Sequence, residues 1–419
     1  MTEVERKAPA ARQASIKLST TSDQQRQNLL HAIAAVLLEQ QEHILHANKL
    51  DLAEAEKAGR DAAYLDRLEI NDTRLADLAD AVTSVAELED PLGTTLRSWT
   101  RPNGLSIREV SVPLGVIAAV FEARPNVTAD ISALALRTGN AVLLRGSRSA
   151  INTNKALTAA IQRGLQNSSL PQEAVQLIES PERSATTELM EASEWIDVLI
   201  PRGGKELINK VVRESHVPVI ETGAGNCHVY IDKDADAELA RKIAVDAKVQ
   251  RPSVCNAAET LLVEASWAEQ HLAELIDSLS SHGVTLRGCE TTTSLDQRVY
   301  AAQEEDWETE YLNLTAAIKI VQDVHEACAH ISKWGTKHSE AIITENPEAK
   351  DLFFQTVDAS TLYHNASTRF TDGFEFGLGA EVGISTQKLH ARGPMGLQAL
   401  TTVKYLVEGN GQCKGSLSY

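Results

Sequence analysis

The chain has 419 residues, 43% of them hydrophobic, and a formal net charge of -18. A chain of this length can bury a large core, and its length suggests two or three domains. The charge opposes binding to nucleic acid or to an anionic membrane surface, since both repel a polyanion that has no strong basic patch. We therefore expect neither as a partner.

The first residues, MTEVERKAPAARQ, lack the apolar core of a signal peptide, and no run approaches the ~18 apolar residues of a spanning helix. We expect a cytoplasmic protein. The cysteines are odd in number and form no CxxC pair, which argues against a disulfide framework and against a zinc site, so we expect no metal. They are Cys227, Cys255, Cys289, Cys328 and Cys413.

The N-terminal part is predicted to be helical. Ser22 and Gln25 have the spacing of a capping box at the start of a helix. One apolar stripe follows, formed by Leu30, Ile33, Ala34, Leu37 and Leu38. A second, polar helix passes through AEAEKAG and is expected to end at Gly59.

From about residue 113 the pattern changes to short apolar runs that alternate with amphipathic stretches, which indicates βαβ repetition. The runs are VIAAVF, AVLLR, VQLI and IDVLI, and after residue 255 ETLLVEA, VTLRG, AAIKIV, SEAIITE and DASTLY. Continuous apolar runs are typical of parallel strands covered on both faces. The fold class is therefore α/β, with two doubly wound parallel-sheet domains.

Residues 97–112 contain the turn Pro102-Asn103-Gly104 between stretches of alternating polarity, and we predict a protruding hairpin there. The tail from Met395 ends in β-prone residues with no later element to pack against. We expect this terminal strand to pair with the hairpin of another subunit.

Cys255 lies in the sequence QRPSVCNA, where Pro252 breaks the preceding helix. A thiol on such a loop can be exposed and reactive. Taken alone, an inert buried cysteine is the commoner case.

Two further segments favour a reactive Cys255: ETGAGN at 221–226 and LGVIAAVFEARPN, which ends at residue 126. Together with the cysteine they resemble three signatures of the aldehyde dehydrogenase superfamily, namely a strand ending in a catalytic Asn, a Glu followed by glycines, and the nucleophilic Cys. The resemblance extends over nearly the whole chain. Segments such as FEARPNVTAD, HNASTRF and FGLGAEVGISTQKLHARGPMGL are similar to the branch that reduces an acyl phosphate.

The resemblance implies an aldehyde dehydrogenase-like fold in which residues 1–96 and 113–246 bind the cofactor and residues 247–394 carry the nucleophile. Residues 97–112 and 395–419 would form a small β oligomerisation hairpin with its terminal strand, so we expect a homo-oligomer, a dimer or a tetramer.

The implied reaction is one step of proline biosynthesis. Cys255 would attack gamma-glutamyl phosphate to give a thioester, which NADPH reduces to glutamate 5-semialdehyde, leaving NADP and phosphate. The Asn126 amide and the Cys255 N–H would stabilise the oxyanion. Taken alone, Asn126 is a turn residue after Pro125. Because acyl phosphates decompose in water, a functional association with glutamate 5-kinase is expected.

Glu221 matches the glutamate that activates water in hydrolytic members, although hydrolysis of the thioester would waste the substrate. Three roles stay open for Glu221: it moves a proton, orients the cofactor or caps the glycine turn.

For the cofactor no GxGxxG follows the first strand, so the ordinary dinucleotide fingerprint is absent. By resemblance, Arg145, Ser147 and Arg148 contact the adenosine ribose, and Arg148 would attract a 2′-phosphate, which favours NADPH over NADH. Otherwise Arg148 is a solvated helix-start residue. A strand-to-helix turn suited to the pyrophosphate is formed by Pro201, Arg202, Gly203, Gly204 and Lys205; otherwise it is a plain glycine turn. The last cofactor candidate is Glu310, although the following Tyr311-Leu312 departs from the family pattern.

The substrate needs cations and polar groups at both ends. Arg251 is the candidate for the phosphate end, and Asn365, Ser367, Thr368 and Arg369 are candidates for the amino acid head. His364 and His390 receive no role, because the scheme requires no histidine.

Three alternatives remain: a hydrolytic aldehyde dehydrogenase that acts on another small aldehyde, a non-catalytic oligomeric nucleotide-binding protein, and a Cys-His thiol hydrolase. No motif ties a histidine to Cys255, which disfavours the last.

Overall fold

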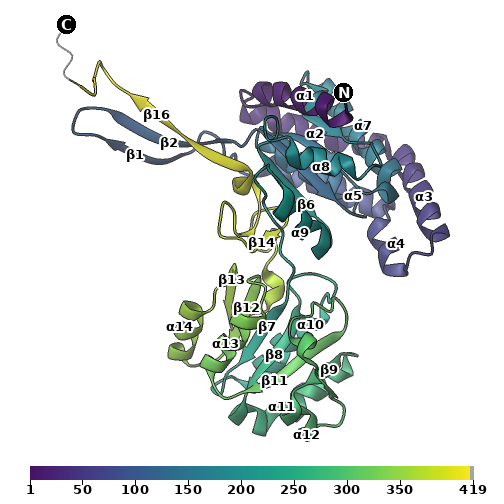
Figure 1. Ribbon diagram of the computed structural model, residues 1–419, viewed down its shortest axis with the longest axis vertical. Coiled ribbons are helices and arrows are strands. Elements are labelled where there is room, and N and C mark those ends of the chain that lie inside the picture. The colour runs from purple at the N-terminus through teal and green to yellow at the C-terminus, as the bar shows by residue number, and fades with distance from the viewer. Residues whose placement is uncertain (416–419) are drawn as a thin grey trace. The chain divides into compact units, whose positions relative to one another are not determined.

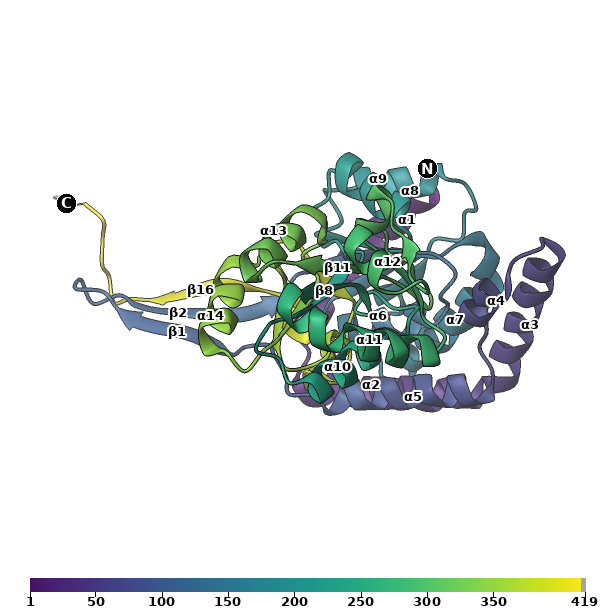
Figure 2. The same cartoon turned by 90° about the horizontal axis from the view of Figure 1, so that it is seen from below.

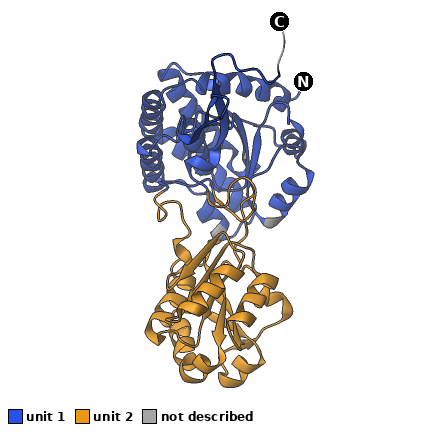
Figure 3. Ribbon diagram, turned by 90° about the vertical axis from the view of Figure 1, so that its left-hand side faces the viewer, with its two compact units in different colours: residues 1–220, 378–382, 395–419 blue, residues 221–377, 383–394 orange. Residues whose placement is uncertain are grey.

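The computed structural model describes residues 1–415, apart from the side chains of Ala63 and Lys205. It forms two compact units (Figure 3): unit 1 contains residues 1–220, 378–382 and 395–419, and unit 2 contains residues 221–377 and 383–394. The sequence led us to expect a boundary at 246/247. The structure divides earlier because β7 (Cys227–Ile231) pairs with two strands of unit 2.

Unit 1 begins with five helices, α1 (Glu3–Leu18), α2 (Asp23–Glu39), α3 (Gln41–Lys57), α4 (Ala62–Leu68) and α5 (Asp72–Glu87). The capping box of Ser22 and Gln25 is confirmed at the start of α2, and α3 ends just before Gly59, whose φ is +70°. Helices α2 and α5 pack along each other (Figure 2). The predicted stripe is wrong at Leu38, which is 46% exposed, while Leu29 on the packed face is buried.

The βαβ repetition of unit 1 is confirmed. Strands β3 (Val116–Phe121), β4 (Ala141–Arg145), β5 (Val175–Leu177) and β6 (Val198–Arg202) form a parallel sheet in the order β5-β4-β3-β6. Its helices are α6 (Val127–Arg137), α7 (Ile151–Asn167), α8 (Ser184–Glu191) and α9 (Lys205–Glu214). Every residue of β3 is buried, as expected for a strand covered on both faces.

The predicted hairpin exists as β1 (Thr95–Thr100) and β2 (Ser106–Pro113), joined through Gly104 at φ +88°. The terminal strand has a partner within its own chain, and its expected pairing with the hairpin of another subunit stays a prediction. Strand β16 (Thr401–Glu408) pairs antiparallel with β2 of its own chain, from Thr401↔Pro113 to Glu408↔Ser106. This pairing satisfies the second edge of β2 within one molecule and gives the three-stranded sheet β1-β2-β16 seen in Figure 1.

Unit 2 contains a seven-stranded parallel sheet in the order β10-β9-β11-β8-β7-β12-β13. Besides β7, its strands are β8 (Ala258–Glu264), β9 (Thr285–Gly288), β10 (Tyr300–Ala301), β11 (Thr315–Val321), β12 (Ser339–Ile343) and β13 (Thr361–His364). Helices α10 (Ala237–Val249) and α11 (Ala265–Ser281) pack on one face, and α13 (Val324–Trp334) and α14 (Pro347–Thr356) on the other. The short elements are α12 (Glu290–Leu295), β14 (Ile384–Ser385) and β15 (Gly393–Pro394).

The segments before β7 and before β8 enter this sheet at the same edge, because the two strands are parallel neighbours. Residues 221–226 precede β7 and residues 250–257 precede β8. The topology thus brings the glycine-rich segment and the cysteine loop together.

Within residues 1–415, no helix is long and apolar enough to cross a membrane. The same residues contain no cluster of three or more His, Cys, Asp or Glu side chains suited to a metal ion.

His330 on α13 makes the stability of unit 2 sensitive to acid. Its ring packs 5.5 Å from the rings of His228 and Trp307, and burial, helped by nearby His228 and lysines, lowers its pKa to about 3. The unfolded chain takes up a proton near pH 6.5, whereas the folded chain does not, so stability is lost as the pH falls below 6.5.

We predict that lowering the pH from 7 to 5 removes about 2 kcal/mol of unfolding free energy through His330. In urea titrations at the two pH values, His330→Gln should lose about 2 kcal/mol less unfolding free energy than the wild type. The control is His325→Gln, which replaces an exposed histidine on the same helix. An equal pH dependence in His330→Gln and wild type would contradict the assignment.

Candidate active site

Cys255 lies on the loop between α10 and β8, and we call residues 250–257 the nucleophile loop. Helix α10 ends at Val249, and Gln250 is its C-cap, two residues before Pro252. A turn follows in which the Ala257 N–H donates to the Val254 carbonyl. The Cys255 side chain is partly exposed, whereas the next residues are buried, so a partly accessible thiol stands on a fixed base.

A buried ion pair closes the two ends of the nucleophile loop. Lys248 near the end of α10 pairs with Glu259 near the start of β8, and both side chains are fully buried. Glu259 also accepts a hydrogen bond from the Leu312 N–H at 3.2 Å. Burial lowers the pKa of Lys248 and raises that of Glu259 to about 7, while the pairing opposes both changes.

Residues 367–371 hold the loop from a second side. The Arg369 guanidinium donates to the Asn256 carboxamide oxygen and, at 2.9 Å, to the Gln250 carboxamide oxygen, so it bridges both ends of the loop. The Thr368 hydroxyl donates to the Asn256 carbonyl at 2.7 Å. Burial and the nearby Arg251 lower the pKa of Arg369.

The glycine-rich segment at 221–226 lies against the nucleophile loop. A Cβ on Gly225 would overlap the carbonyl oxygen of Cys255, so only glycine fits there. The Gly225 N–H donates to the Glu310 carboxylate at 2.8 Å, which brings this predicted cofactor residue to the segment. Glu221 opens the segment, and its N–H donates to the Gln387 side chain at 3.1 Å.

The other residues proposed to bind the substrate differ in exposure and in the bonds that their side chains already make. Arg251 is exposed on the nucleophile loop. Ser367 and Thr368 are buried, and the Ser367 hydroxyl accepts from the Arg369 N–H. Asn365 follows β13 and has a backbone φ of +51°. Its side chain bonds to Thr344 and Glu345 beyond the carboxyl end of β12, so it links the ends of β12 and β13.

A buried polar cluster beneath the loop was missed from the sequence. The Cys227 thiol donates to the Cys255 carbonyl at 3.2 Å and lies 3.7 Å from His338 Nδ1. His338 bonds to Ser339, whose hydroxyl bonds to that of Thr371 at 2.6 Å. No spacing rule in the sequence indicates such contacts, because they depend on the pairing of β7 with β8 and β12.

In unit 1 the cofactor candidates cluster at the carboxyl ends of neighbouring strands. Arg145 ends β4 and Arg202 ends β6, on either side of β3. Ligands of parallel α/β sheets bind at this edge. The buried Arg145 Nε has no hydrogen-bond partner among the described residues, which fits a site that receives a polar ligand.

Ser147 and Arg148 stand at the start of a short 3-10 helix after β4. The Ser147 hydroxyl bonds to that of Ser149 at 2.7 Å. Arg148 is exposed, so its guanidinium can meet a phosphate group in solution.

The turn at 201–204 leads from β6 into α9, and Gly203 and Gly204 are exposed. The exposed Glu122 carboxylate accepts the Gly204 N–H at 2.8 Å, at the helix start that we expected to meet the pyrophosphate. Lys205 begins α9, but its side chain lies outside the described residues. An anion at this turn would therefore compete with Glu122, a residue that the sequence did not single out.

Asn126 belongs to unit 1 and starts α6, directly after Pro125. Its side-chain amide donates to the Asp130 carboxylate at 2.9 Å. Burial raises the pKa of Asp130 to about 6, and the bond from Asn126 opposes that rise. One of the two amide N–H groups is thus used, and the other remains available for a ligand.

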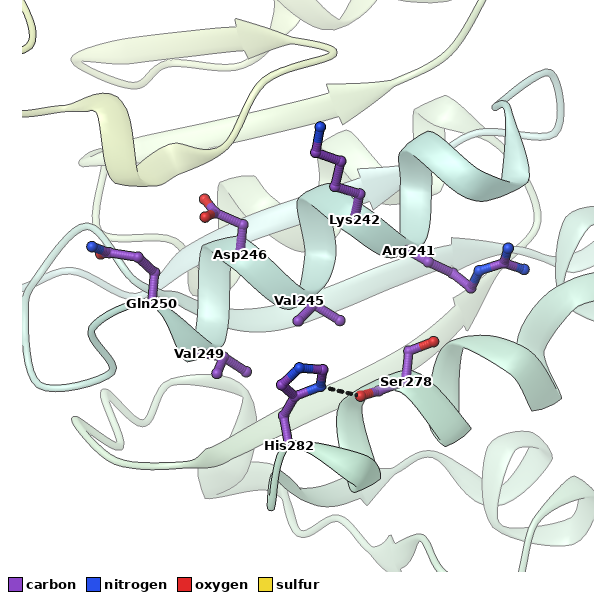
Figure 4. Close-up of a pocket in the computed structure, with 8 residues that line it drawn as sticks. All are labelled: Arg241, Lys242, Val245, Asp246, Val249, Gln250, Ser278 and His282. Atoms are coloured by element: carbon purple, nitrogen blue, oxygen red, sulfur yellow. Dashed lines mark hydrogen bonds between the residues drawn. The ribbon is translucent and has the colours of Figure 1, made fainter.

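A pocket of about 500 Å³ lies on unit 2 between α10 and α11 (Figure 4). Its walls include Arg241 and Val245 from α10, Gln250 at the start of the nucleophile loop, and Ser278 and His282 from α11 and its end. Figure 4 shows that Arg241 and Lys242 extend in different directions, and Arg241 pairs with Glu274. None of the predicted site residues lines this pocket, so it plays no part in the assignment.

Comparison with known proteins agrees with this arrangement. The model of the aldehyde dehydrogenase family matches residues 1–295. The crystal structure of an acetylating aldehyde dehydrogenase from Geobacillus thermoglucosidasius shares the fold at 17% identity, with a TM-score of 0.70 over 99% of this chain and 98% of that chain. The chain therefore belongs to the aldehyde dehydrogenase family.

Among individual proteins, the chain is similar to gamma-glutamyl phosphate reductases. It is 53% identical to those of Bacillus cereus and Bacillus mycoides, over 99% of this chain and 100% of each relative. The crystal structure of gamma-glutamyl phosphate reductase from Thermotoga maritima matches with a TM-score of 0.97 and 44% identity, over 99% of this chain and 100% of that chain. The enzyme is thus an oxidoreductase that uses a nicotinamide cofactor.

Proposed function

We propose that this enzyme reduces gamma-glutamyl phosphate to glutamate 5-semialdehyde with NADPH, releasing phosphate, as the second step of proline biosynthesis from glutamate. The observation that carries the proposal is the partly exposed Cys255 on a loop closed by buried contacts, in a chain 53% identical to gamma-glutamyl phosphate reductases along its length.

The chemistry on this chain begins at the Cys255 sulfur. The thiolate attacks the acyl carbon, a C–S bond forms, and the acyl–oxygen bond breaks with phosphate as the leaving group. Arg251, exposed on the same loop, is our candidate to bind the departing phosphate. When bound, NADPH supplies the hydride that converts the thioester into a thiohemiacetal, and the aldehyde leaves as the Cys255 sulfur is released.

Both tetrahedral species carry an oxyanion. We propose the Cys255 N–H and the Asn126 amide as its donors, each typically worth ~3 kcal/mol in the transition state. For Glu221 the three roles of proton transfer, cofactor orientation and capping stay open. In the structure Arg369 and Thr368 bond to the nucleophile loop, and the Ser367 hydroxyl accepts from the Arg369 N–H. The contact that we propose for these residues and Asn365 with the amino acid head therefore rests on resemblance alone.

For the cofactor, the fit rests on the carboxyl edge of the unit 1 sheet. Arg145 and Ser147 would face the adenosine ribose, Arg148 the 2′-phosphate, and residues 201–205 the pyrophosphate. Glu310, bonded to Gly225, is proposed to steady the nicotinamide ribose. Free thiols and a reduced cofactor suit the reducing cytoplasm, where we expect the reaction to take place.

The first test follows NADP reduction by purified enzyme with glutamate 5-semialdehyde, the reverse direction. We expect reduction that requires phosphate and that falls at least ~10³-fold in Cys255→Ala, because the substitution removes the sulfur that would form the thioester. Cys413→Ala, which removes an exposed thiol, is the matched control. Turnover without phosphate would instead favour a hydrolytic aldehyde dehydrogenase.

Cofactor preference is tested at Arg148. We expect Arg148→Glu to weaken NADP binding about 10- to 100-fold and to leave NAD binding nearly unchanged, because the substitution replaces a charged hydrogen-bond donor by a repelling carboxylate. Titration of cofactor fluorescence measures both constants, with Arg213→Glu, an exposed arginine on α9, as the control. Equal losses for NADP and NAD would refute the assignment.

A functional association with glutamate 5-kinase is proposed because the acyl phosphate decomposes in water. In a coupled assay we expect the semialdehyde yield to fall when a dialysis membrane separates the two enzymes. Equal yields in the mixed and separated reactions would show that free diffusion suffices.

We also propose that the sheet β1-β2-β16 mediates assembly into a homo-oligomer. Every residue of β1 is exposed, and Trp99 and Tyr405 contact each other edge to face, with ring centres 6.2 Å apart. Val403 and Val407 extend the same face of β16 and are 40% and 53% exposed. An apolar face and two open strand edges of this kind are typical of association with a second copy.

The double variant Trp99→Lys/Tyr405→Lys should therefore have a smaller mass in light scattering than the wild type, because two cations would be buried in the interface. Thr402→Lys, three residues before Tyr405 and on the opposite face of β16, is the control. An unchanged mass of the double variant would rule out this face as the interface.

A further inference from the structure

Cys227 stands out as a chemical group that the proposed reaction does not use. It is fully buried at the start of β7, and its thiol donates a hydrogen bond to the carbonyl oxygen of Cys255 at 3.2 Å. The two cysteines meet because β7 pairs with β8, with Cys227 opposite Ala258. The backbone of the nucleophile is therefore contacted by a second thiol.

The surroundings keep the proton on the Cys227 sulfur. Burial raises the pKa of this thiol well above its usual range, and the nearby Glu340 carboxylate adds to the rise. On its other side, His338 is 3.7 Å away, and burial lowers the pKa of His338 to about 4, so the imidazole is neutral. A buried neutral thiol is a lasting donor and a poor nucleophile.

The Cys255 carbonyl has little freedom to move. Gly225 packs so closely against it that a Cβ would overlap the oxygen. The following peptide is fixed by Asn256, whose carboxamide donates to the Thr371 carbonyl at 2.8 Å and whose carbonyl accepts from Thr368. The Cys227 bond thus completes a set of contacts that fix the backbone on which the reactive sulfur is mounted.

We propose, resting on the function above, that Cys227 is a positioning residue: its S–H bond to the Cys255 carbonyl holds the nucleophile loop in the orientation that presents the Cys255 sulfur and N–H to the substrate. Cys227 itself takes no part in bond making. Its effect is expected on the rate of attack at the acyl carbon and not on binding, since a bond far from the substrate changes the position of the nucleophile.

The test compares Cys227→Ala with Cys227→Ser, which have nearly the same volume and differ in the hydroxyl donor. We expect Cys227→Ala to lower kcat about tenfold, the value of one ordinary hydrogen bond, with KM within about twofold of wild type. Iodoacetamide labelling, quantified on the Cys255 peptide, should slow in parallel. Cys227→Ser should restore most of both rates.

Cys328→Ala is the matched control, because Cys328 is also buried in unit 2 but packs in the apolar cluster around α13. Equal effects of Cys227→Ala and Cys328→Ala, or a serine variant no better than alanine, would overturn the proposal. If Cys227→Ala does not fold, as judged by circular dichroism, the isosteric pair Cys227→Thr and Cys227→Val makes the same comparison. A wild type without NADP-dependent activity would refute the proposed function, and the labelling rates alone would then decide the role of Cys227.

Discussion

The buried pair of Lys248 and Glu259 is the interaction on which the candidate site depends, because it closes the nucleophile loop at both ends. Two fully buried charges cost free energy to desolvate, so such a pair is poor evidence for stability. Its value is geometric: removing one partner would leave the other charge buried alone, at a cost of about 3–5 kcal/mol, so the ends of the loop cannot separate cheaply. The Glu259 bond to Leu312 also positions the segment that carries Glu310.

The two parallel sheets use opposite edges. In unit 1 the predicted cofactor residues follow strands and lie at the carboxyl edge, the usual ligand edge of such sheets. In unit 2 Cys255 and Gly225 precede strands and lie at the amino edge. A loop that enters a buried strand is anchored by the hydrogen-bonded strand that follows it, which gives Cys255, our proposed nucleophile, a rigid base while its side chain stays partly accessible.

The sequence predicted the elements whose signals are local. The capping box at Ser22, the hydrophobic runs and the turn at Gly104 depend on neighbouring residues, and they were located correctly. The partner of β16 was not predictable, because an open strand edge offers the same hydrogen bonds to its own chain and to another copy. The family resemblance singled out Cys255 as the candidate nucleophile, but the contact of Arg369 with both ends of the loop joins residues more than 100 positions apart and could not be read from the sequence.

The polar cluster under the loop continues into a second buried polar group, formed by His228, Glu340 and His330, and together they lower the stability of the fold. Among the residues described, the Nε2 atoms of His228, His330 and His338 and one Glu340 oxygen are buried without a hydrogen-bond partner. Each such atom typically costs about 1–3 kcal/mol, and a core built for stability alone would replace these groups by apolar side chains. Proteins tolerate such costs chiefly at functional sites, where a fixed backbone counts for more than total stability. Within this cluster, His338 lies 3.7 Å from the Cys227 thiol, and that thiol donates to the Cys255 carbonyl, so the role that we propose for Cys227 would place part of this polar character behind Cys255.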